Sequence, residues 1–536
     1  MSSLIATALL IALVGASQAI PHLCNTNCQQ KRLEHDHHAS LKRLLDENRA
    51  QSLQKYAGRA SRRLAPNPDD LQALTSLYKS TGGANWTEST GWKEGTSGDP
   101  CGATPWHGIS CNDDGRVVAI ELVYNNLVGR LPADLVKASN VEHLVFYSNL
   151  LAGPVPSGLL NSKNLIEFDV NNNAMSGRLP DAIDAPKLQS FVLYANEFSG
   201  SLPSQWNAPS LQYLDVSDNQ FTGSPPEAIG ELEDVVQLVV SRNNLTGEFP
   251  TSWGHLTKLE QLWSFNNDIR GPLPESWSAL RLLENVEIDG ILGVLPDWLG
   301  TSWTRVQNLL LPRGNMSGSI PASICHLERV EYLWLFQNNL TGSIPDCMGK
   351  MVKLQSLELS DNRLSGSLPE SLGELYNVSY FYASRNRLNG SLPESLSRMK
   401  ALQVLDVSSN MITGGIPASY VAFTDRVYSF AVCYNSLSGP VPASLERFFK
   451  FIDDYTCDMY GNPWSCPVPG VVPKSCGCQC SECNTGAKRQ SCAQCVASAG
   501  CGFCANGPNC IEGSASAPAS GYECPVSQWT YGSGNC

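Results

Sequence analysis

The chain has 536 residues, of which 37 are basic and 50 acidic, and its formal net charge is -13. This length exceeds that of an ordinary compact domain and predicts either several domains or a repeat array. The acidic balance lacks the positive surface that binds phosphate backbones or anionic lipid, so no nucleic-acid partner is expected.

Residues 1–19 are predicted to be a signal peptide. The apolar run 4–15 is too short to span a bilayer, and the small residues Ser17 and Ala19 precede the expected cleavage point. No later segment is apolar and long enough to cross a membrane. The 20 cysteines indicate an oxidising compartment. We therefore expect a secreted protein, located outside the cell or at the cell wall or surface, without a membrane span.

Residues 20–64 form a polar segment whose stretch 41–56, LKRLLDENRAQSLQKY, has helical spacing. The histidines His35, His37 and His38 lack a carboxylate or cysteine frame, so a solvated surface is expected rather than a metal site. The dibasic pair Arg62 and Arg63 is consistent with a cleavable pro-segment or with an ordinary linker, and the sequence does not distinguish these two.

A repeated frame, L-x-x-L-x-L-x-x-N-x-L-x-G-x-I/L/V-P, occupies residues 117–442. Its glycine recurs about every 24 residues and defines fourteen repeats. The fourteen glycines are Gly129, Gly153, Gly177, Gly200, Gly223, Gly247, Gly271, Gly293, Gly318, Gly342, Gly366, Gly390, Gly414 and Gly439.

The sequence of one repeat, LQSLELSDNRLSGSLP, predicts the structure of a single coil. Leu357 and Leu359 alternate with polar residues, which predicts a short strand with one buried face. Asn362 is expected to turn inward and satisfy backbone groups at the end of the strand, and Gly366 to permit a tight bend. Because one coil cannot cover its own apolar face, the coils must stack. The predicted fold class is an α/β solenoid with a parallel β-sheet on its concave side.

This frame, with its Gly-x-Ile-Pro extension, resembles the plant-type extracellular leucine-rich repeat. The resemblance implies a leucine-rich repeat superhelix like those of polygalacturonase-inhibiting proteins and of receptor-like protein ectodomains. Members of that family bind ligands and seldom catalyse.

The resemblance extends to caps at both ends of the array. Residues 65–116 are similar to the N-terminal cap, with a helix from Asp70, three tryptophans and a stapling loop from Cys101 to Cys111. Residues 443–479 are similar to the C-terminal cap, in which Cys457 and Cys466 are expected to form disulfides. Cys325 and Cys347 lie in neighbouring repeats, so a bridge between adjacent coils is also expected.

Residues 480–536 are rich in cysteine. Paired C-x-x-C spacing is found in zinc sites, but the export signal favours disulfides. The run SCAQCVASAGCGFC resembles the small cysteine-rich module of plexins, semaphorins and integrins, although Phe503 stands where that family usually has tryptophan. The resemblance implies the pairs Cys483–Cys501, Cys492–Cys536, Cys495–Cys510 and Cys504–Cys524.

No motif of a nucleophile elbow, phosphate loop or zinc protease occurs, so no catalytic residue, cofactor or metal is predicted. Acidic residues recur in one column of the expected concave face: Glu121, Asp169, Asp215, Glu287, Glu358 and Asp406. Two such carboxylates are the requirement for glycoside hydrolysis. A solvated sheet face shows the same pattern, and this second interpretation is favoured.

Aromatic residues stand where alternation predicts exposure on the same face. LEQLWSFNND (259–268) and VEYLWLFQNN (330–339) each place a tryptophan and a phenylalanine there. A contiguous aromatic patch indicates an interaction surface, whereas simple stacking that stiffens the sheet is the alternative. The predicted ligand-binding patch comprises Trp263, Phe265, Glu287, Asp289, Arg313, Tyr332, Trp334, Phe336, Glu358, Tyr380, Tyr382 and Arg385.

Two irregular repeats and a set of glycosylation sequons favour binding on this face. Repeat eight is two residues short and lacks its asparagine, and repeat nine has Gly314 in that position. Three sequons (Asn244, Asn315 and Asn339) are expected on one flank, which would leave the concave face free. The six sequons are Asn85, Asn244, Asn315, Asn339, Asn377 and Asn389.

The predicted function is extracellular recognition of a peptide, protein or glycan, with a membrane co-receptor as a further partner. Inhibition of a wall-degrading enzyme is a subclass that the family resemblance permits. The alternative is a structural component of an extracellular matrix or surface coat.

Overall fold

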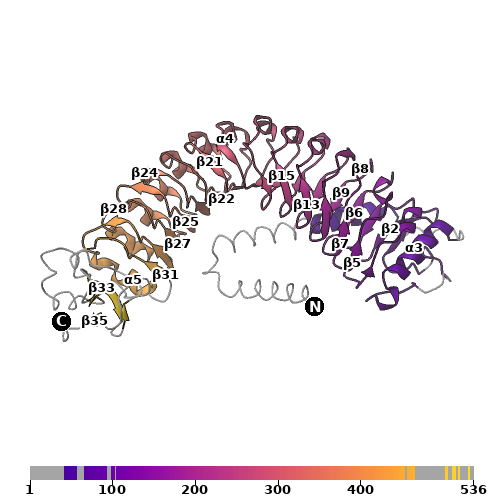
Figure 1. Cartoon of the computed structure of the whole chain (residues 1–536), viewed down its shortest axis with the longest axis horizontal. Coiled ribbons are helices and arrows are strands. Elements are labelled where there is room, and N and C mark those ends of the chain that lie inside the picture. The colour runs from indigo at the N-terminus through magenta and orange to yellow at the C-terminus, as the bar shows by residue number, and fades with distance from the viewer. Residues whose placement is uncertain are drawn as a thin grey trace. The chain divides into compact units, whose positions relative to one another are not determined.

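The computed structural model describes residues 42–56, 66–92, 98–102, 104–452 and 456–464, and the backbone of short strands between residues 501 and 531. The chain splits into two compact units. The first comprises Met1–Ser199 with Asn207–Tyr213, and the second comprises Gly200–Trp206 with Leu214–Cys536. Each unit contains stacked coils around its own core of aliphatic side chains (Figure 1).

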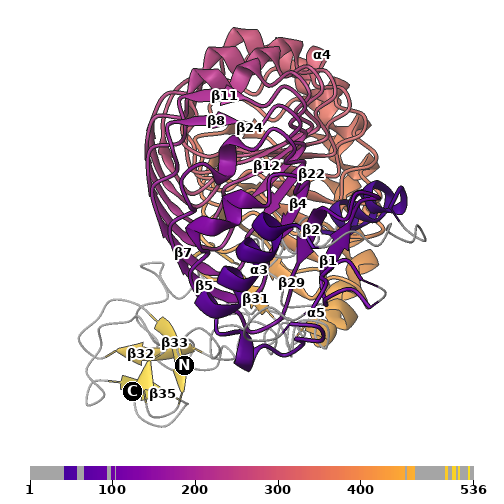
Figure 2. The same cartoon turned by 90° about the vertical axis from the view of Figure 1, so that its right-hand side faces the viewer.

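The first unit begins with an α-helix over residues 42–54, followed by helix α3 (Pro68–Ser80). Asn67 caps α3, because its side-chain oxygen accepts hydrogen bonds from the N–H groups of Asp69 and Asp70 at 3.0 and 3.1 Å. Helix α3 lies beside strand β2 (Val117–Glu121) at the start of the array (Figure 2). The helix expected from Asp70 is therefore confirmed.

Three tryptophans pack against one another next to α3. The rings of Trp86 and Trp92 are 4.9 Å apart, those of Trp92 and Trp106 are 5.0 Å apart, and all three are buried. The predicted disulfide Cys101–Cys111 is present. Strand β1 (Ile109–Cys111) pairs antiparallel with β2 and covers the end of the sheet, as an array cap must.

The coils of the first unit carry a parallel sheet. Strand β2 is followed by β4 (His143–Val145), β6 (Glu167–Asp169) and β9 (Ser190–Val192), each in register with the one before. A second row of parallel strands comprises β3 (Val128–Gly129), β5 (Leu150–Gly153), β7 (Ala174–Gly177) and β10 (Glu197–Gly200). The other short elements are η2 (Gly83–Asn85), η3 (Ala133–Lys137), η4 (Leu159–Asn161), β8 (Ala182–Asp184), β11 (Gln205–Asn207) and β12 (Tyr213–Asp215).

The second unit has a longer parallel sheet. Its strands run in sequence order: β14 (Gln237–Val239), β16 (Gln261–Trp263), β18 (Asn285–Glu287), β20 (Asn308–Leu310), β22 (Tyr332–Trp334), β23 (Ser356–Glu358), β25 (Tyr380–Tyr382), β27 (Val404–Asp406), β29 (Ser429–Ala431) and β31 (Thr456–Asp458). We call the surface of the parallel sheet that faces away from the core of the coils, in each unit, its strand face.

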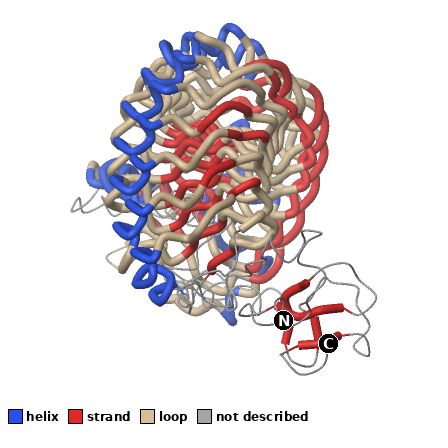
Figure 3. The backbone as a smooth tube through the Cα atoms, turned by 90° about the vertical axis from the view of Figure 1, so that its left-hand side faces the viewer, coloured by secondary structure: helices blue, strands red, loops and turns tan. Residues whose placement is uncertain are grey.

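Short 3-10 helices form the opposite side of the coils in the second unit (Figure 3). They are η5 (Glu227–Glu231), η6 (Thr251–His255), η7 (Glu275–Ala279), η8 (Ala322–His326), η9 (Asp346–Lys350), η10 (Glu370–Glu374), η11 (Glu394–Arg398), η12 (Ala418–Phe423) and η13 (Ala443–Leu445), with the α-helices α4 (Trp298–Ser302) and α5 (Glu446–Ile452).

A second row of short strands joins the two sides of these coils. The strands are β13 (Gln220–Gly223), β15 (Asn244–Gly247), β17 (Asp268–Ile269), β19 (Leu292–Val294), β21 (Asn315–Ser317), β24 (Ser365–Ser367), β26 (Arg387–Asn389), β28 (Thr413–Gly414) and β30 (Ser436–Leu437). The fold is thus a leucine-rich repeat solenoid, and the predicted fold class is confirmed.

The packing of one coil agrees with the expectation from its sequence. Leu357 and Leu359 have no exposed surface. The side-chain oxygen of Asn362 accepts a hydrogen bond from the N–H of Leu340 at 3.0 Å, and its amide nitrogen donates to the carbonyl oxygen of Leu335 at 2.9 Å. These bonds satisfy backbone groups between adjacent coils. Gly366 has a φ of 78°, a left-handed conformation that favours glycine.

The structure confirms part of the expected disulfide framework. Cys325 in η8 and Cys347 in η9 form the predicted bridge between adjacent coils. Cys457 is disulfide-bonded, as expected, whereas Cys466, which was also expected to form a disulfide, lies outside the described residues. Cys433 is a free, buried thiol.

The described part of the cysteine-rich segment is a four-stranded antiparallel sheet in the order β34-β33-β32-β35. The strands are β32 (Cys501–Cys504), β33 (Cys510–Ser514), β34 (Ala517–Pro518) and β35 (Trp529–Tyr531). The cysteine pairing predicted for this segment lies outside the described residues. The signal peptide, the three N-terminal histidines and the dibasic pair lie outside them as well.

Candidate ligand-binding face

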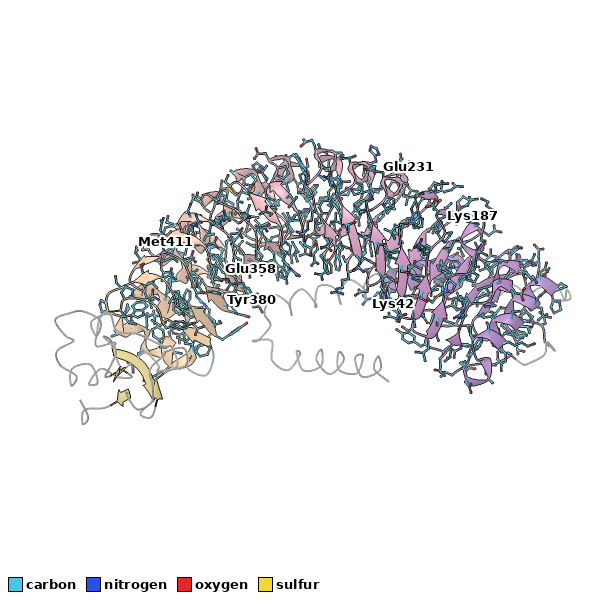
Figure 4. The ribbon with its side chains drawn as sticks, viewed as in Figure 1. Lys42, Lys187, Glu231, Glu358, Tyr380 and Met411 are labelled. Atoms are coloured by element: carbon cyan, nitrogen blue, oxygen red, sulfur yellow. A yellow bond between two sulfur atoms is a disulfide. The ribbon has the colours of Figure 1, made fainter. Side chains whose placement is uncertain are left out.

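The residues predicted to bind a ligand lie on the strands of the parallel sheet of the second unit or in the short segments that follow these strands. Neighbouring strands align them in rows, because Trp263 is in register with Glu287 and Trp334 with Glu358, which is in turn in register with Tyr382. Figure 4 shows Glu358 and Tyr380 on the inner side of this unit, whereas Met411 lies on the outer side. The structure therefore brings the predicted residues onto one face.

The expected exposure of three large rings is wrong. The exposed fraction is 6% for Trp263, 2% for Phe265 and 1% for Trp334. Adjacent parallel strands lie about 4.8 Å apart, so side chains of a neighbouring strand can cover an outward-facing ring. Trp263 and Phe265 form a cluster with Val239 of the preceding strand. Alternation along one strand predicts which side a residue faces, but lateral neighbours decide whether water reaches it.

Trp334 is held in one orientation by a polar contact. Its indole nitrogen donates a hydrogen bond to the hydroxyl of Ser356 on the next strand at 3.0 Å. The rings of Tyr332 and Phe336 lie 6.2 and 6.3 Å from the ring of Trp334. The ring of Trp334 therefore has a defined orientation and packs near the rings of Tyr332 and Phe336.

Four aromatic residues of the predicted patch remain accessible. Tyr332, Phe336, Tyr380 and Tyr382 are half-buried. Burial, followed by the nearby charge of Glu358, raises the pKa of the Tyr382 hydroxyl well above its usual range. All four rings offer apolar surface and the three tyrosines add hydroxyl groups, a combination that is enriched where proteins bind partners.

Arginines border this accessible area. Arg313 and Arg385 are exposed. The Nη1 of Arg313 donates to the side-chain oxygen of Asn266 at 3.2 Å, and the Nη2 of Arg385 donates to Asp361 at 2.6 Å. Both guanidinium groups lie at the rim, where they can contact a carboxylate or a carbonyl of a bound molecule.

Three acidic residues lie inside the patch. Glu287, Glu358 and Asp289 are 3%, 4% and 8% exposed. One oxygen of Asp289 accepts a hydrogen bond from the N–H of Asn266 at 2.8 Å, and the other has no hydrogen-bond partner among the described residues. Burial raises the pKa of Asp289, although the bond from Asn266 opposes this effect. Asp289 is thus a buried acceptor whose second oxygen is shielded from solvent.

The irregular repeats lie within this patch. Gly290 has a φ of 76°, and a Cβ placed there would lie 2.3 Å from the carbonyl oxygen of Ile269. A Cβ at Gly314 would lie 2.4 Å from the carbonyl oxygen of Ile291. The backbones of adjacent coils therefore approach more closely here than an asparagine would permit. Asp289, which accepts from the preceding coil, takes over part of the role of the missing asparagine.

The glycosylation sequons are accessible. Five of the six asparagines are exposed and Asn339 is half-buried, where its side chain contacts that of Asn315 in the adjacent coil. Asn244, Asn315 and Asn389 belong to β15, β21 and β26 in the second row of strands. This row is separate from the strand face, so glycans there would leave the predicted patch open.

Sequence reasoning did not find a second site, which lies on the strand face of the first unit. The helix 42–54 lies on this face, and Lys42 is on the inner side of the unit, whereas Lys187 is on the outer side (Figure 4). Arg49 forms a two-pronged ion pair with Glu167 of β6: its Nε lies 2.9 Å from Oε2, and its Nη2 lies 2.6 Å from Oε1.

The helix expected within 41–56 is confirmed over residues 42–54, but its contact with the repeats was not foreseen. One signal was available in the sequence. The residues that contact the repeats recur at helical spacing on one face: Lys42, Leu45, Arg49, Ser52 and Tyr56. A face made of mixed residue types gives a weak pattern, because apolar periodicity is the usual indicator.

The electrostatics of this second site are strongly coupled. Burial acts to raise the pKa of Glu167, but the hydrogen bonds from Arg49 and His143 outweigh it, so the pKa lies below its usual range. Burial raises the pKa of Asp169 to about 7. Burial also raises the pKa of Glu121, although the charge of Arg49 opposes it. Two carboxylates of the acidic column thus share this site with a cation.

No cluster of histidine, cysteine or acidic residues suited to a metal ion occurs within the ranges that the structure describes. Within those same ranges, none of the helices has the length and apolar character needed to cross a bilayer.

Comparisons with known proteins agree with the repeat frame. The Leucine Rich Repeat family profile matches residues 210–232, 329–351, 353–375 and 401–421. A probable leucine-rich repeat receptor-like protein kinase of Arabidopsis thaliana is 38% identical over 87 residues, which are 14% of this chain and 9% of the relative. The chain thus matches about a tenth of that relative's length.

Solved structures show the same architecture over longer ranges. The Arabidopsis receptor kinase HAESA, in complex with the peptide hormone IDA and the co-receptor SERK1, superposes with a TM-score of 0.61 at 26% identity, covering 73% of this chain and 66% of that chain. A leucine-rich repeat protein of Leptospira interrogans superposes with a TM-score of 0.51 at 25% identity, covering 62% of this chain and 82% of that chain.

Proposed function

We propose that this leucine-rich repeat protein is a secreted, non-enzymatic recognition protein that binds a peptide or a segment of a protein on the strand face of its second unit. The observation that carries this proposal is the group of half-buried rings on β22 and β25, namely Tyr332, Tyr380 and Tyr382, with arginines at its rim. Such rings bury large apolar area at low entropic cost and anchor partners.

The buried residues of the predicted patch have a supporting role in this proposal. The buried rings of Trp263, Phe265 and Trp334 make this surface rigid. A rigid surface loses less entropy on binding than a mobile one. The hydroxyl groups of the accessible tyrosines can accept a hydrogen bond from a backbone N–H of the ligand. An extended peptide carries both donors and apolar side chains, which suits this combination better than a purely apolar ligand does.

The similarity to HAESA supports a peptide rather than a glycan, because that receptor was solved with a peptide hormone. The same complex contains a co-receptor, so a membrane-bound co-receptor is proposed as the partner that transmits the signal. Inhibition of a wall-degrading enzyme is the special case in which the bound segment belongs to such an enzyme.

A binding screen of the glycosylated full chain against peptide, protein and oligosaccharide panels tests this function. The variant Tyr332→Ala/Tyr380→Ala removes accessible rings and leaves the tryptophans in place. The matched control is Tyr376→Ala, which removes a 40% exposed tyrosine directly after η10, on the other side of the coil. The proposal requires a peptide or protein hit that the first variant weakens at least about tenfold and the control does not.

Other outcomes would assign a different function. A hit confined to oligosaccharides would replace the peptide by a glycan. Concentration-dependent self-association that Tyr332→Ala/Tyr380→Ala abolishes would support the structural matrix or coat component. A hit that both variants leave unchanged would exclude the strand face of the second unit as the binding site.

The domain boundaries follow from the same proposal. We propose that secretion removes residues 1–19, that 20–64 precede an N-terminal cap at 65–116, and that 117–442 carry the fourteen repeats. Residues 443–479 would form the C-terminal cap and 480–536 the disulfide-rich module. N-terminal sequencing of the secreted protein tests the cleavage after Ala19, and disulfide mapping by mass spectrometry tests the four pairs expected in the module.

A further inference from the structure

The strand face of the first unit carries a segment of the protein's own chain. Residues 42, 45, 46, 49, 52, 53 and 56 are buried or half-buried, whereas residues 43, 44, 47, 48, 50, 51, 54 and 55 are exposed. This alternation is the periodicity of one helix face laid against a surface. The segment is therefore a helix docked along one side, and its two faces differ in their contacts.

The centre of the contact is an ion pair with complementary shape. Arg49 is 7% exposed and Glu167 is 3% exposed. Besides its two bonds to Glu167, Arg49 reaches Asp46 of its own helix at 3.0 Å and Glu121 of β2 at 3.5 Å. A planar guanidinium matches a carboxylate in this two-pronged geometry, which an ammonium group cannot reproduce.

The neighbourhood of Glu167 is arranged to accept a cation. His143 of β4 lies 2.9 Å from Glu167 through Nδ1 and 3.0 Å from the hydroxyl of Ser52 through Nε2. Asp169 and Glu121 add two further carboxylates, and both are more than two-thirds removed from solvent. Without Arg49, these acids would be buried close together with no strong cation among the described contacts, an arrangement that desolvation and repulsion make unfavourable.

Contacts at both ends fix the direction of the helix. Lys42 donates to the hydroxyl of Tyr124 at 2.9 Å and lies over the rings of Tyr124 and Tyr147. At the other end, Lys55 and the hydroxyl of Tyr56 both donate to Glu142 at 2.9 Å. Leu45 packs with Val192, Tyr213 and Tyr194, which adds an apolar contact beside the ion pair. The surface thus contacts charged, aromatic and apolar side chains that lie along one face of the helix.

We propose that the strand face of the first unit is a recognition surface for an arginine-bearing helical peptide, and that residues 42–56 occupy it as an internal ligand. An outside partner must displace this segment before it can use the surface. The partner that fits has the same pattern, with a leucine four residues before the arginine and a cation three residues before that leucine. This inference does not depend on the ligand of the second unit.

Hydrogen exchange in the full chain provides the first test. Arg49→Ala removes the central cation, and Arg43→Ala is the matched control, because Arg43 belongs to the same helix and is exposed. Amides of residues 42–54 are expected to exchange slowly in the wild-type chain and after Arg43→Ala. After Arg49→Ala they are expected to exchange about 100-fold faster, whereas the repeats keep their protection. Arg49→Lys keeps the charge without the fork and should fall between these values.

A labelled synthetic peptide of residues 41–56 provides the second test. It is expected to bind the Arg49→Ala chain at least about tenfold more tightly than the wild-type chain or the Arg43→Ala chain, because only the first leaves the surface open. A peptide that itself carries Arg49→Ala is expected not to bind. Rapid exchange of residues 42–54 in the wild-type chain, or equal exchange after the two arginine substitutions, would overturn the proposal. Equal peptide binding by all three chains would overturn it as well.

Discussion

Asp70 and Arg116 form a two-pronged ion pair that joins helix α3 to strand β2. The Nε and Nη2 of Arg116 each lie 2.8 Å from one oxygen of Asp70, and the N–H of Val117 donates to the same carboxylate at 3.0 Å. Asp70 is 1% exposed. This carboxylate therefore satisfies a charged and a backbone donor at the point where the cap meets the array.

Replacement of Asp70 should weaken the cap. Asp70→Ala is expected to lower the free energy of unfolding by about 2–3 kcal/mol, because the Val117 N–H loses its buried acceptor while Arg116 partly regains solvent. Urea denaturation measures this change. The control is Asp69→Ala, an exposed acid in the same first turn, for which a loss of about 0.5 kcal/mol is expected. Equal losses would show that the ion pair contributes nothing specific.

The two aromatic classes on the strand face of the second unit should respond differently to substitution. Trp334→Ala is expected to reduce the free energy of unfolding by about 3–5 kcal/mol, because it empties a closely packed site. Phe336→Ala removes a half-buried ring and is expected to cost about 1 kcal/mol. Urea denaturation of the two variants tests the distinction between supporting and accessible rings, and a comparable cost for both would contradict it.

Asp169 predicts an unusual pH dependence of stability. Its pKa is raised to about 7 by burial, so the folded state holds this proton more tightly than the unfolded state does. Between about pH 4 and pH 7 the unfolded state releases the proton first, and stability falls as the pH rises through this range. Above pH 7 the ionised Asp169 lowers the free energy of unfolding by its full amount, about 4 kcal/mol.

The variant Asp169→Asn isolates this effect. Asparagine keeps the acceptor for the N–H of Asn171, which lies 3.0 Å from the carboxylate, but it carries no charge. The stability of the variant relative to wild type is expected to increase from pH 4.5 to pH 8, measured by urea denaturation at both values. Glu167 acts in the opposite direction, because its lowered pKa gives stability that is lost as the pH falls. A constant difference between the two proteins would exclude the raised pKa.

The bridge between Cys325 and Cys347 is expected to stabilise the middle of the second unit. It closes a loop with a sequence separation of 22 and links η8 to η9. The double variant Cys325→Ser/Cys347→Ser is expected to lose about 2–4 kcal/mol, chiefly because its unfolded state gains conformational freedom. Thermal unfolding without reductant tests this value. Cys433→Ser, at a free buried thiol, is the control and is expected to cost about 1 kcal/mol.

The solenoid follows from local sequence patterns alone. Leucines at fixed spacing, an inward asparagine and a glycine in the left-handed region recur in most coils, and each acts within its own coil or on the adjacent one. The hydrogen bond from the N–H of Leu340 to Asn362 shows how short this range is, since the residues are 22 apart. The bridge between Cys325 and Cys347 was predictable for the same reason.

The accessibility of residues on the strand faces, and the identity of what covers them, depend on contacts that form only in the folded chain. Trp263 and Trp334 were expected to face solvent because alternation places them outward, but side chains of the adjacent strands bury them. Arg49 meets Glu167 across 118 residues of sequence, and no local pattern joins these two. Periodicity describes the neighbours along one strand or one coil, whereas burial and charge pairing depend on neighbours that only the folded chain brings together.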